Sequence, residues 1–430
     1  MKIRFTACLS MVLVLVGLVL SSSLCGKAQA AGFALYEWSA RGNALGGAMI
    51  AKADDASAIA WNPAGITQLE GTQTLAGVSL IAPSNDMTTS YNGIDTKEST
   101  NKKVFVPPHA YITHQVNDSL WLGVGTFTRF GLGTSFDQNW SGRYSSYDTE
   151  LNSFSVNPNL AYKFNEYISF ALGVELMYVR ADLRKKIAPS GANDPNNTTN
   201  DVDQRIIVDT VSPGFNAGVR ITPNDEWAIG FSYRSEMLHH ASGSASYNVP
   251  TGVSTATRFN DADVTMSMNT PNMYMLGVEY KPIPNLSLEA DAIYSEWSAY
   301  SDINYNFANS KAIGASNVTV NKKWEDVWRF QLGVEYLPLD DFDLALRAGY
   351  VYDQSPIREG YEDYMLPTND RQMVSTGFGM TFDSFVVDVS YNYLWMKDRT
   401  IAARAGSGVL DTKTTNGLTH IVGLSLGYNF

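Results

Sequence analysis

The chain has 430 residues, of which only 17% are charged, and its formal net charge is −12. Disordered chains are rich in charge and nucleic-acid binders need clustered lysine and arginine, so the composition excludes both classes. Only one stretch, at the N-terminus, is apolar enough to enter a bilayer as a helix, which excludes a bundle of transmembrane helices.

Residues 1–30 have the pattern of an export signal. Lys2 and Arg4 precede an apolar run over residues 7–20, and Ala28-Gln29-Ala30 places small residues where signal peptidase cleaves. We therefore predict cleavage after Ala30. Both cysteines of the chain precede that site, so we expect an exported protein that is not stabilised by disulfides.

Residues 31–71 form a second segment, which is rich in alanine and glycine. They lack the period of a strand, and Asp54 and Asp55 stand before a possible short helix that ends near Trp61. The segment is too long for a disordered tail of this composition. Its role depends on the elements that follow.

From about residue 72 onward, apolar residues alternate with polar ones, which is the period of a β-strand. Every second residue is apolar or aromatic from Ile168 to Tyr178 and from Phe385 to Trp395. Short turns such as Asn165-Glu166 alternate with long polar connections such as residues 188–203. Fourteen strands are predicted, over residues 72–82, 103–116, 118–130, 142–164, 167–186, 203–222, 226–248, 261–281, 286–307, 318–337, 341–354, 371–382, 385–401 and 415–430.

An even number of long strands, with tight turns at one end and long loops at the other, is typical of a bacterial outer-membrane barrel. Strands of soluble sandwiches average about 5–6 residues, whereas the segment 142–164 is far longer. We predict an all-β fold, in which residues 72–430 form a 14-stranded antiparallel transmembrane β-barrel. Residues 31–71 would fill its lumen as an N-terminal hatch, or plug, because an unfilled lumen would be an open water channel. A periplasmic extension without a gating role is the alternative for this segment.

The C-terminal strand supports an outer-membrane location. Val422, Leu424, Leu426, Tyr428 and the terminal Phe430 share one face. An alternating last strand that ends on an aromatic residue resembles the signal read by the outer-membrane barrel assembly machinery. We therefore predict Tyr428 and Phe430 as an assembly signal, and that machinery as a partner.

Several motifs resemble one family, the long-chain fatty acid and aromatic hydrocarbon transporters of Gram-negative outer membranes. Ala31-Gly32-Phe33, the run over residues 53–56 and Asn62-Pro63-Ala64 are similar to the N-terminal hatch of that family. Trp140-Ser141-Gly142-Arg143-Tyr144 and the run over residues 324–329 are further matches. The resemblance covers essentially the whole mature chain, and its most specific part is the Asn-Pro-Ala motif.

The resemblance implies passive uptake of hydrophobic molecules, such as long-chain fatty acids or hydrocarbons. The resemblance further implies that the molecule passes an apolar pocket inside the barrel and leaves sideways near a kink in the third strand. Glycines lie in the predicted third strand, and glycine within a strand often marks a bulge or a close approach of the backbone. The implied residues are Phe33, Asn62, Pro63 and Ala64 for the hatch and gating, Gly123 and Gly125 for the strand kink, and Arg180 and Phe33 for ligand binding.

One position departs from the family pattern. Where fatty-acid members tend to have a lysine, this chain has Glu325, and Lys322 and Lys323 are close but out of position. The departure leaves neutral hydrocarbons or aromatics open as substrates. A structural or adhesive barrel without specific transport is the alternative function.

We expect no enzyme, no cofactor and no metal site. The five histidines show no metal-ligand spacing, and His420, the best candidate for a membrane hydrolase, has no catalytic partner in the sequence. Outer-membrane lipid, lipopolysaccharide and a hydrophobic small molecule are the expected partners, and nucleic acid is not.

Overall fold

The structure is a computed structural model, which describes residues 32–191, 193–338 and 344–430. The predicted export signal, with its cleavage site after Ala30, lies outside these residues, as does the start of the predicted strand 341–354. No helix within the described ranges is long and apolar enough to cross a membrane. The dominant element is the β-strand, and the strands join in one sheet.

Within the described residues the sheet contains 21 strands, all paired antiparallel. In chain order they are β1 (Thr72–Tyr91), β2 (Ile94–Ser99), β3 (Pro108–Asn117), β4 (Leu120–Phe127), β5 (Gly131–Ser135), β6 (Asp148–Lys163), β7 (Ile168–Ile187), β8 (Val202–Asn224), β9 (Trp227–Arg234), β10 (Met237–Asn248), β11 (Ala262–Thr270), β12 (Met273–Ile283), β13 (Leu286–Ser295), β14 (Asp302–Phe307), β15 (Asn317–Asn321), β16 (Val327–Tyr336), β17 (Leu344–Asp353), β18 (Arg371–Phe382), β19 (Phe385–Met396), β20 (Arg399–Ile401) and β21 (Asp411–Asn429).

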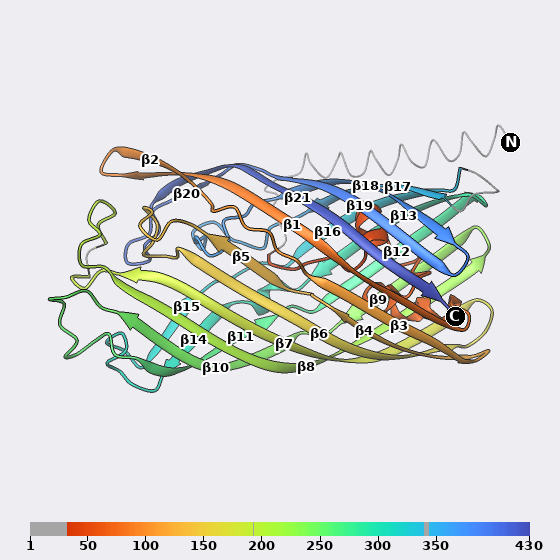
Figure 1. The fold of residues 1–430 in the computed structure, drawn as a ribbon, viewed down its shortest axis with the longest axis horizontal. Helices are drawn as coiled ribbons and strands as arrows, with labels where there is room; N and C mark the ends of the chain where they lie inside the picture. Colours follow the sequence, from red (N-terminus) through yellow and green to blue (C-terminus); the bar gives the residue numbers. More distant parts are fainter. Residues whose placement is uncertain (1–31, 192, 339–343) are drawn as a thin grey trace.

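The first and last long strands close the sheet into a barrel (Figure 1). β1 and β21 pair antiparallel, from Gln73 opposite Asn429 to Ser90 opposite Asp411. The remaining pairs follow the chain around the wall, and several wall positions are occupied by two short strands in succession, such as β4 and β5 against β6. The predicted all-β, 14-stranded antiparallel barrel is confirmed.

The prediction of one continuous strand per wall position is wrong in several places. The predicted strands 226–248, 261–281, 286–307, 318–337 and 385–401 each cover two strands, and the predicted strand 118–130 ends at a break before β5. Within 286–307 the chain turns into the lumen as the short 3₁₀ helix η2 (Trp297–Ala299). The two halves of a broken strand keep the same alternation, so the sequence pattern does not reveal the break.

The first predicted strand, 72–82, ends too early. β1 continues to Tyr91 and turns back as β2, which makes a long hairpin at the loop end of the barrel. Its register against β21 shifts between Ser84 and Asp86. Such an irregularity interrupts the alternation of side chains, which explains the short prediction.

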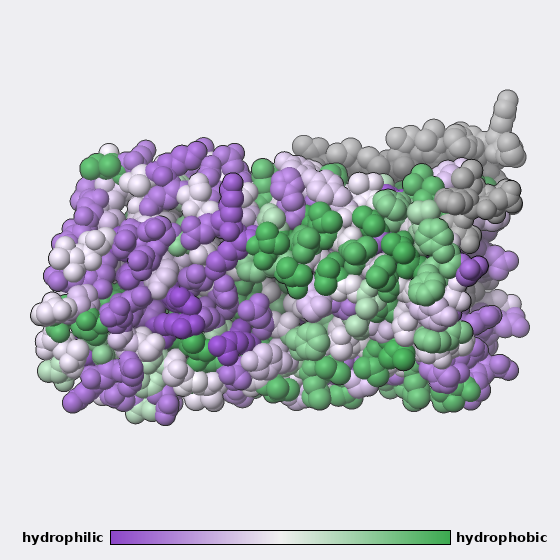
Figure 2. Space-filling model, in the orientation of Figure 1, coloured by the Kyte–Doolittle hydropathy of each residue, from purple (hydrophilic) through white to green (hydrophobic). Residues whose placement is uncertain are grey.

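The outer surface of the barrel carries a belt of hydrophobic side chains, on the half that holds the C-terminus (Figure 2). Leu172 and Val211, on neighbouring strands, expose 67% and 61% of their surface. This exposure is unfavourable in water and favourable against lipid tails. A row of aromatic rings crosses five adjacent strands, with successive centroids 4.9–6.3 Å apart: Phe215, Tyr233, Tyr274, Tyr294 and Trp328. Such a girdle marks a membrane interface.

Residues 32–71, here named the N-terminal segment, contribute no strand to the wall and lie inside the barrel (Figure 1). Their helices are α2 (Ala40–Ala44), α3 (Ala58–Trp61) and the 3₁₀ helix η1 (Pro63–Gln68). The backbone N–H of Ala40 donates to Ser425 Oγ of β21, and that of Met49 donates to Asp291 Oδ2 of β13. Because these partners lie on different parts of the wall, the segment spans the lumen.

Candidate ligand-binding site

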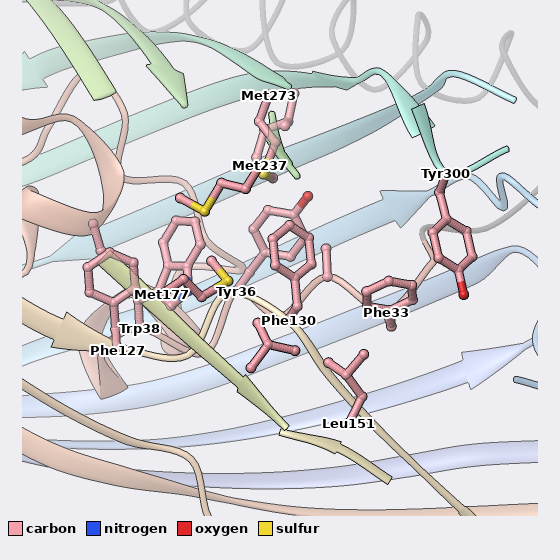
Figure 3. Close-up of a cluster of buried hydrophobic side chains, with 14 of the residues drawn as sticks. Phe33, Tyr36, Trp38, Phe127, Phe130, Leu151, Met177, Met237, Met273 and Tyr300 are labelled. Atoms are coloured by element: carbon pink, nitrogen blue, oxygen red, sulfur yellow. The ribbon is translucent and has the colours of Figure 1, made fainter. Parts of the chain in front are cut away.

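Phe33, near the start of the N-terminal segment, is enclosed by four rings, here named the aromatic cage. The rings belong to Phe130, Trp297, Tyr300 and Trp324, with centroids 5.7, 4.8, 5.3 and 5.7 Å from that of Phe33. Figure 3 shows Phe33 between Phe130 and Tyr300. Most of these contacts are edge-to-face, which aromatic pairs favour. The cage therefore suits an apolar guest, but the ring of Phe33 already fills it.

The wall is broken in its third strand, beside the aromatic cage. Residues 128–130 separate β4 from β5. There the N-terminal segment pairs with the wall, since Leu35 N donates to Arg129 O at 2.8 Å and Gly131 N donates to Phe33 O at 3.0 Å. The segment thus supplies partners to backbone groups that the third strand leaves unpaired. Movement of its first residues would break both bonds.

The kink assigned to Gly123 and Gly125 is wrong, because both glycines lie inside the regular strand β4 and the wall break comes later. A Cβ atom on Gly123 would lie 2.8 Å from Ile59 Cδ1, and one on Gly125 would lie 2.8 Å from Ile59 Cγ2. The two glycines instead make room for Ile59 of α3 against the inner wall. Glycine in a strand marks a close approach as well as a bulge.

Asn62 ties the N-terminal segment to the wall. Its Nδ2 donates to Ile50 O at 2.9 Å and to Val219 O of β8 at 3.0 Å, and its Oδ1 accepts from Ala64 N at 3.2 Å. Pro63 is the first residue of η1, where its missing N–H is not needed. The three residues anchor the segment, and their gating role stays a prediction.

We expect Asn62→Ala to lower the free energy of unfolding by about 2–3 kcal/mol, because three backbone groups, two of them in buried bonds, lose a hydrogen bond. The measurement is the urea midpoint of the barrel refolded into lipid vesicles. Asn285→Ala is the matched control, since Asn285 is partly exposed in a turn and donates one side-chain hydrogen bond, to Leu337 O. Equal midpoints for both variants would contradict the anchoring role.

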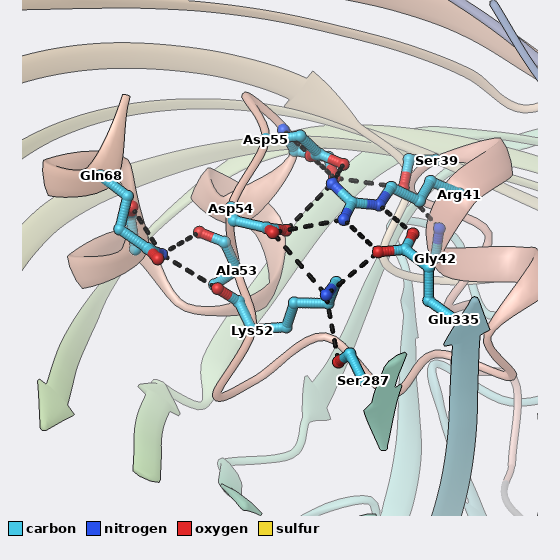
Figure 4. A network of polar contacts seen from close by, with 12 residues as sticks. Ser39, Arg41, Gly42, Lys52, Ala53, Asp54, Asp55, Gln68, Ser287 and Glu335 are labelled. Carbon is cyan, nitrogen blue, oxygen red and sulfur yellow. Dashed lines mark hydrogen bonds and ion pairs between the residues drawn. The ribbon is translucent and has the colours of Figure 1, made fainter. Parts of the chain in front are cut away.

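Ion pairs hold the middle of the N-terminal segment (Figure 4). Arg41 pairs with Asp54 at 2.9 Å and with Glu335 of β16 at 3.0 Å. Lys52 pairs with Glu335 and with Glu279 of β12, both at 3.1 Å. Burial opposes ionisation of Asp54, but Arg41 and Lys52 hold its pKa below the usual value. This part is fixed by charge on several strands, whereas the first residues of the segment are fixed at the wall break.

A cavity of about 440 Å³, here named the wall cavity, adjoins the wall break and the first residues of the N-terminal segment. Buried apolar side chains, such as Met373 and Ile421, line its lumen side. Val106 and Phe154 also line it, and they are 51% and 39% exposed on the outer surface. The wall cavity therefore extends from the lumen to the outside of the wall.

Arg180, predicted to receive a ligand carboxylate, faces away from the lumen. It lies on β7 in the same alternation as Leu176 and Tyr178, and all three are exposed on the outer surface. The intervening Met177 and Val179 are buried inside. Successive side chains of a strand point to opposite faces, so the prediction of a ligand-binding Arg180 is wrong.

The residues around position 325 do not form the family's lysine site either. Glu325 is exposed and pairs with Arg358 at 2.9 Å. Lys322 is buried and pairs with Asp363, so a carboxylate from a loop balances its charge. Lys323 is exposed.

His420 and the predicted assembly signal lie outside the lumen. His420 Nδ1 lies 2.9 Å from Tyr391 Oη on the outer face of the barrel. Phe430 is exposed, and its ring contacts that of Tyr428 with centroids 4.6 Å apart. The assembly role of the two terminal aromatic residues stays a prediction. In the part of the chain that the structure describes, no group of three or more His, Cys, Asp or Glu residues is placed to hold a metal ion.

Sequence analysis missed a buried charged group at the wall break. Glu175 accepts from Arg129 Nη1 at 3.1 Å, from Arg234 Nη1 at 2.9 Å and from Ser155 Oγ at 2.7 Å. Arg234 also donates to two backbone carbonyls of α3. One signal could have revealed it, because Glu175 is the only charged residue in the alternating run 168–178.

These features define a class of protein. A closed barrel with a hydrophobic belt, a lumen filled by its own N-terminal segment and an apolar cavity at a break in the wall are the parts of an outer-membrane transport barrel. The chain belongs to the outer membrane protein transport protein family (OMPP1/FadL/TodX), which matches it over residues 21–430. It is located in the bacterial outer membrane.

Relatives span nearly the whole chain. The long-chain fatty acid transport protein of Escherichia coli O6:H1 is 26% identical over 407 residues, 86% of this chain and 87% of that protein. Outer membrane protein P1 of Haemophilus influenzae is 28% identical over 455 residues, 94% and 96% of the two chains. A Pseudomonas aeruginosa FadL homologue has a TM-score of 0.81 at 21% identity, with 93% of this chain and 100% of that chain covered. The Ralstonia pickettii toluene transporter TbuX has a TM-score of 0.71 at 17% identity, with the same coverage. The two solved structures share the fold.

Proposed function

We propose that the protein takes up hydrophobic molecules passively, through an apolar pocket in the lumen, and releases them sideways into the outer membrane. The observation that carries this proposal is the wall cavity, which reaches from the lumen to the outer surface at the wall break. Each Å² of apolar ligand surface kept from water contributes about 25 cal/mol. A lined apolar path therefore favours entry of molecules that a water-filled pore would not hold.

In this proposal the aromatic cage is the pocket, and Phe33 leaves it when a ligand binds. The names of the relatives support the substrate range, since they include a long-chain fatty acid transport protein and a toluene transporter. Lipopolysaccharide and the barrel assembly machinery are proposed as partners on the sequence alone.

Filling the wall cavity is expected to block uptake. Met373→Trp places a larger side chain in the cavity, and we expect the initial uptake rates of radiolabelled oleate and toluene to fall at least about tenfold. Val374→Trp is the matched control, because the neighbouring Val374 faces outward into the hydrophobic belt. Equal rates for the two variants would contradict lateral release through this cavity.

The alternative function is a structural or adhesive barrel. Cells with and without the gene would then take up every apolar solute at the same rate. An open porin is a third possible function, and planar-bilayer recording tests it. A large steady ion conductance would indicate an open lumen and not a filled one.

A further inference from the structure

Trp297, one of the rings of the aromatic cage, has a buried N–H group without an acceptor. The side chain is fully buried, and its Nε1 makes no hydrogen bond within the described residues. Indole N–H groups usually find a partner when they are buried. Those of Trp38, Trp121 and Trp140 each donate to a backbone carbonyl, at 2.9, 2.7 and 2.8 Å. Because an unpaired buried donor is costly, the position of this one points to a partner that the cage itself does not supply.

The N–H edge of the Trp297 ring faces the start of the N-terminal segment. A Cβ atom on Gly32 would lie 2.7 Å from Trp297 Cζ2 and 2.9 Å from Cε2, the carbon bonded to Nε1. The Phe33 ring lies across the indole, with centroids 4.8 Å apart and an interplanar angle of 67°. Departure of these two residues from the cage would therefore open space beside the unpaired donor. Trp61 Nε1, which is also unpaired in the described part of the chain, belongs to a ring that packs against Trp38 and not to the cage.

The surroundings of the cage suit an uncharged guest. The cage rings carry no formal charge, and the cations beside them have carboxylate partners. Arg129 lies over the Phe130 ring and pairs with Glu175. Lys322 pairs with Asp363. A buried carboxylate requires a partner of opposite charge, whereas a neutral carbonyl oxygen requires only a donor.

We propose that Trp297 Nε1 donates a hydrogen bond to an uncharged acceptor on the ligand once Phe33 has left the cage. The ligand class is an aromatic molecule with a ring of the size of the Phe33 ring and a neutral oxygen attached, such as an aryl ketone. The inference rests on the proposed function and narrows it to a substrate class. A hydrocarbon of the same shape would fill the cage but leave the N–H group unpaired, so it should bind more weakly.

The test compares acetophenone with α-methylstyrene, which has nearly the same shape and no acceptor. In lipid nanodiscs, we expect Trp297→Phe to raise the Kd for acetophenone about fivefold more than the Kd for α-methylstyrene. Taking the ratio of the two Kd values in each variant removes the different partitioning of the two solutes into lipid. Trp328→Phe is the matched control and should leave the ratio unchanged, because Trp328 lies on the outer face of β16 and is 43% exposed. An unchanged ratio in Trp297→Phe, or an equal loss of both solutes, would overturn the hydrogen-bond site.

Nuclear magnetic resonance of isotope-labelled indole groups gives a readout that a merely structural role would not move. Acetophenone is expected to shift the Trp297 N–H proton resonance of the unsubstituted protein downfield, because a hydrogen bond deshields the proton, and α-methylstyrene is not. The resonance is assigned by its absence from Trp297→Phe. The same shift with both solutes would contradict the proposed bond.

Assembly of the variants is checked by the heat-dependent shift of the barrel in gel electrophoresis. If Trp297→Phe does not assemble, Trp297 is replaced by benzothienylalanine, which has nearly the same shape and a sulfur atom in place of the N–H group. The same selective rise in the Kd for acetophenone is expected, and an equal effect on both solutes would again overturn the site. If the unsubstituted protein binds neither solute and supports uptake of neither, the proposed function itself fails. Uptake of both solutes with an unchanged Kd ratio in the variant would overturn only the hydrogen bond.

Discussion

An Ala34→Cys/Phe130→Cys variant is expected to lose uptake when it is oxidised and to regain uptake when it is reduced. Ala34 of the N-terminal segment and Phe130 of the wall break face each other in an antiparallel bridge. The backbone bonds on either side make this a non-hydrogen-bonded pair, with Cα atoms about 4.5 Å apart. A disulfide tolerates that spacing. The predicted mature chain has no other cysteine, so one bridge can form.

The bridge would lock Phe33 inside the aromatic cage, because residue 34 follows it directly. If a ligand must displace Phe33, the initial rates of oleate and toluene uptake should fall at least about tenfold, the factor that about 1.4 kcal/mol represents. Phe130→Cys alone, treated with the same oxidant, controls for the lost ring. Full uptake by the oxidised double variant, with the disulfide verified by mass spectrometry, would show that the N-terminal segment need not move.

The fold could be predicted from the sequence because each wall strand has lipid on one side. Lipid selects apolar residues at every second position, as in the run from Ile168 to Tyr178, so strand number and barrel class could be predicted. The wall break could not be predicted from the sequence. Alternation continues on both sides of residues 128–130, and the residues that pair there, 33–35, come from a segment without a strand period.

The site was predicted only in part, because motifs locate residues along the chain and not around the barrel. Phe33 and Asn62 lie inside the lumen, where the family resemblance implied. Arg180 lies outside, because a shift of one residue along a strand exchanges the two faces. Glu175 and Arg234 lie on the separate strands β7 and β9 and meet only through the pairing of both strands with β8, which no local pattern reveals.

Glu175→Gln is expected to destabilise the barrel more than any other single substitution considered for this protein. The carboxylate of Glu175 is buried with two guanidinium groups, those of Arg129 and Arg234. Removing the negative charge leaves two buried cations without a counter-charge, which costs about 3–5 kcal/mol. Arg234 also holds α3 through its backbone carbonyls, so the N-terminal segment should loosen as well.

A second substitution tests whether charge balance, and not only the loss of contacts, stabilises this group. Arg129→Met leaves one cation paired with one carboxylate, so the free energy of unfolding should fall by less than about 1.5 kcal/mol. Glu166→Gln, in an exposed turn, is the control and should change it by less than about 0.5 kcal/mol. Urea midpoints of the three variants in lipid vesicles give the comparison. An equal fall in the free energy of unfolding for Arg129→Met and Glu175→Gln would contradict this charge balance. The stabilisation would then depend on packing of the Arg129 side chain beside Phe130.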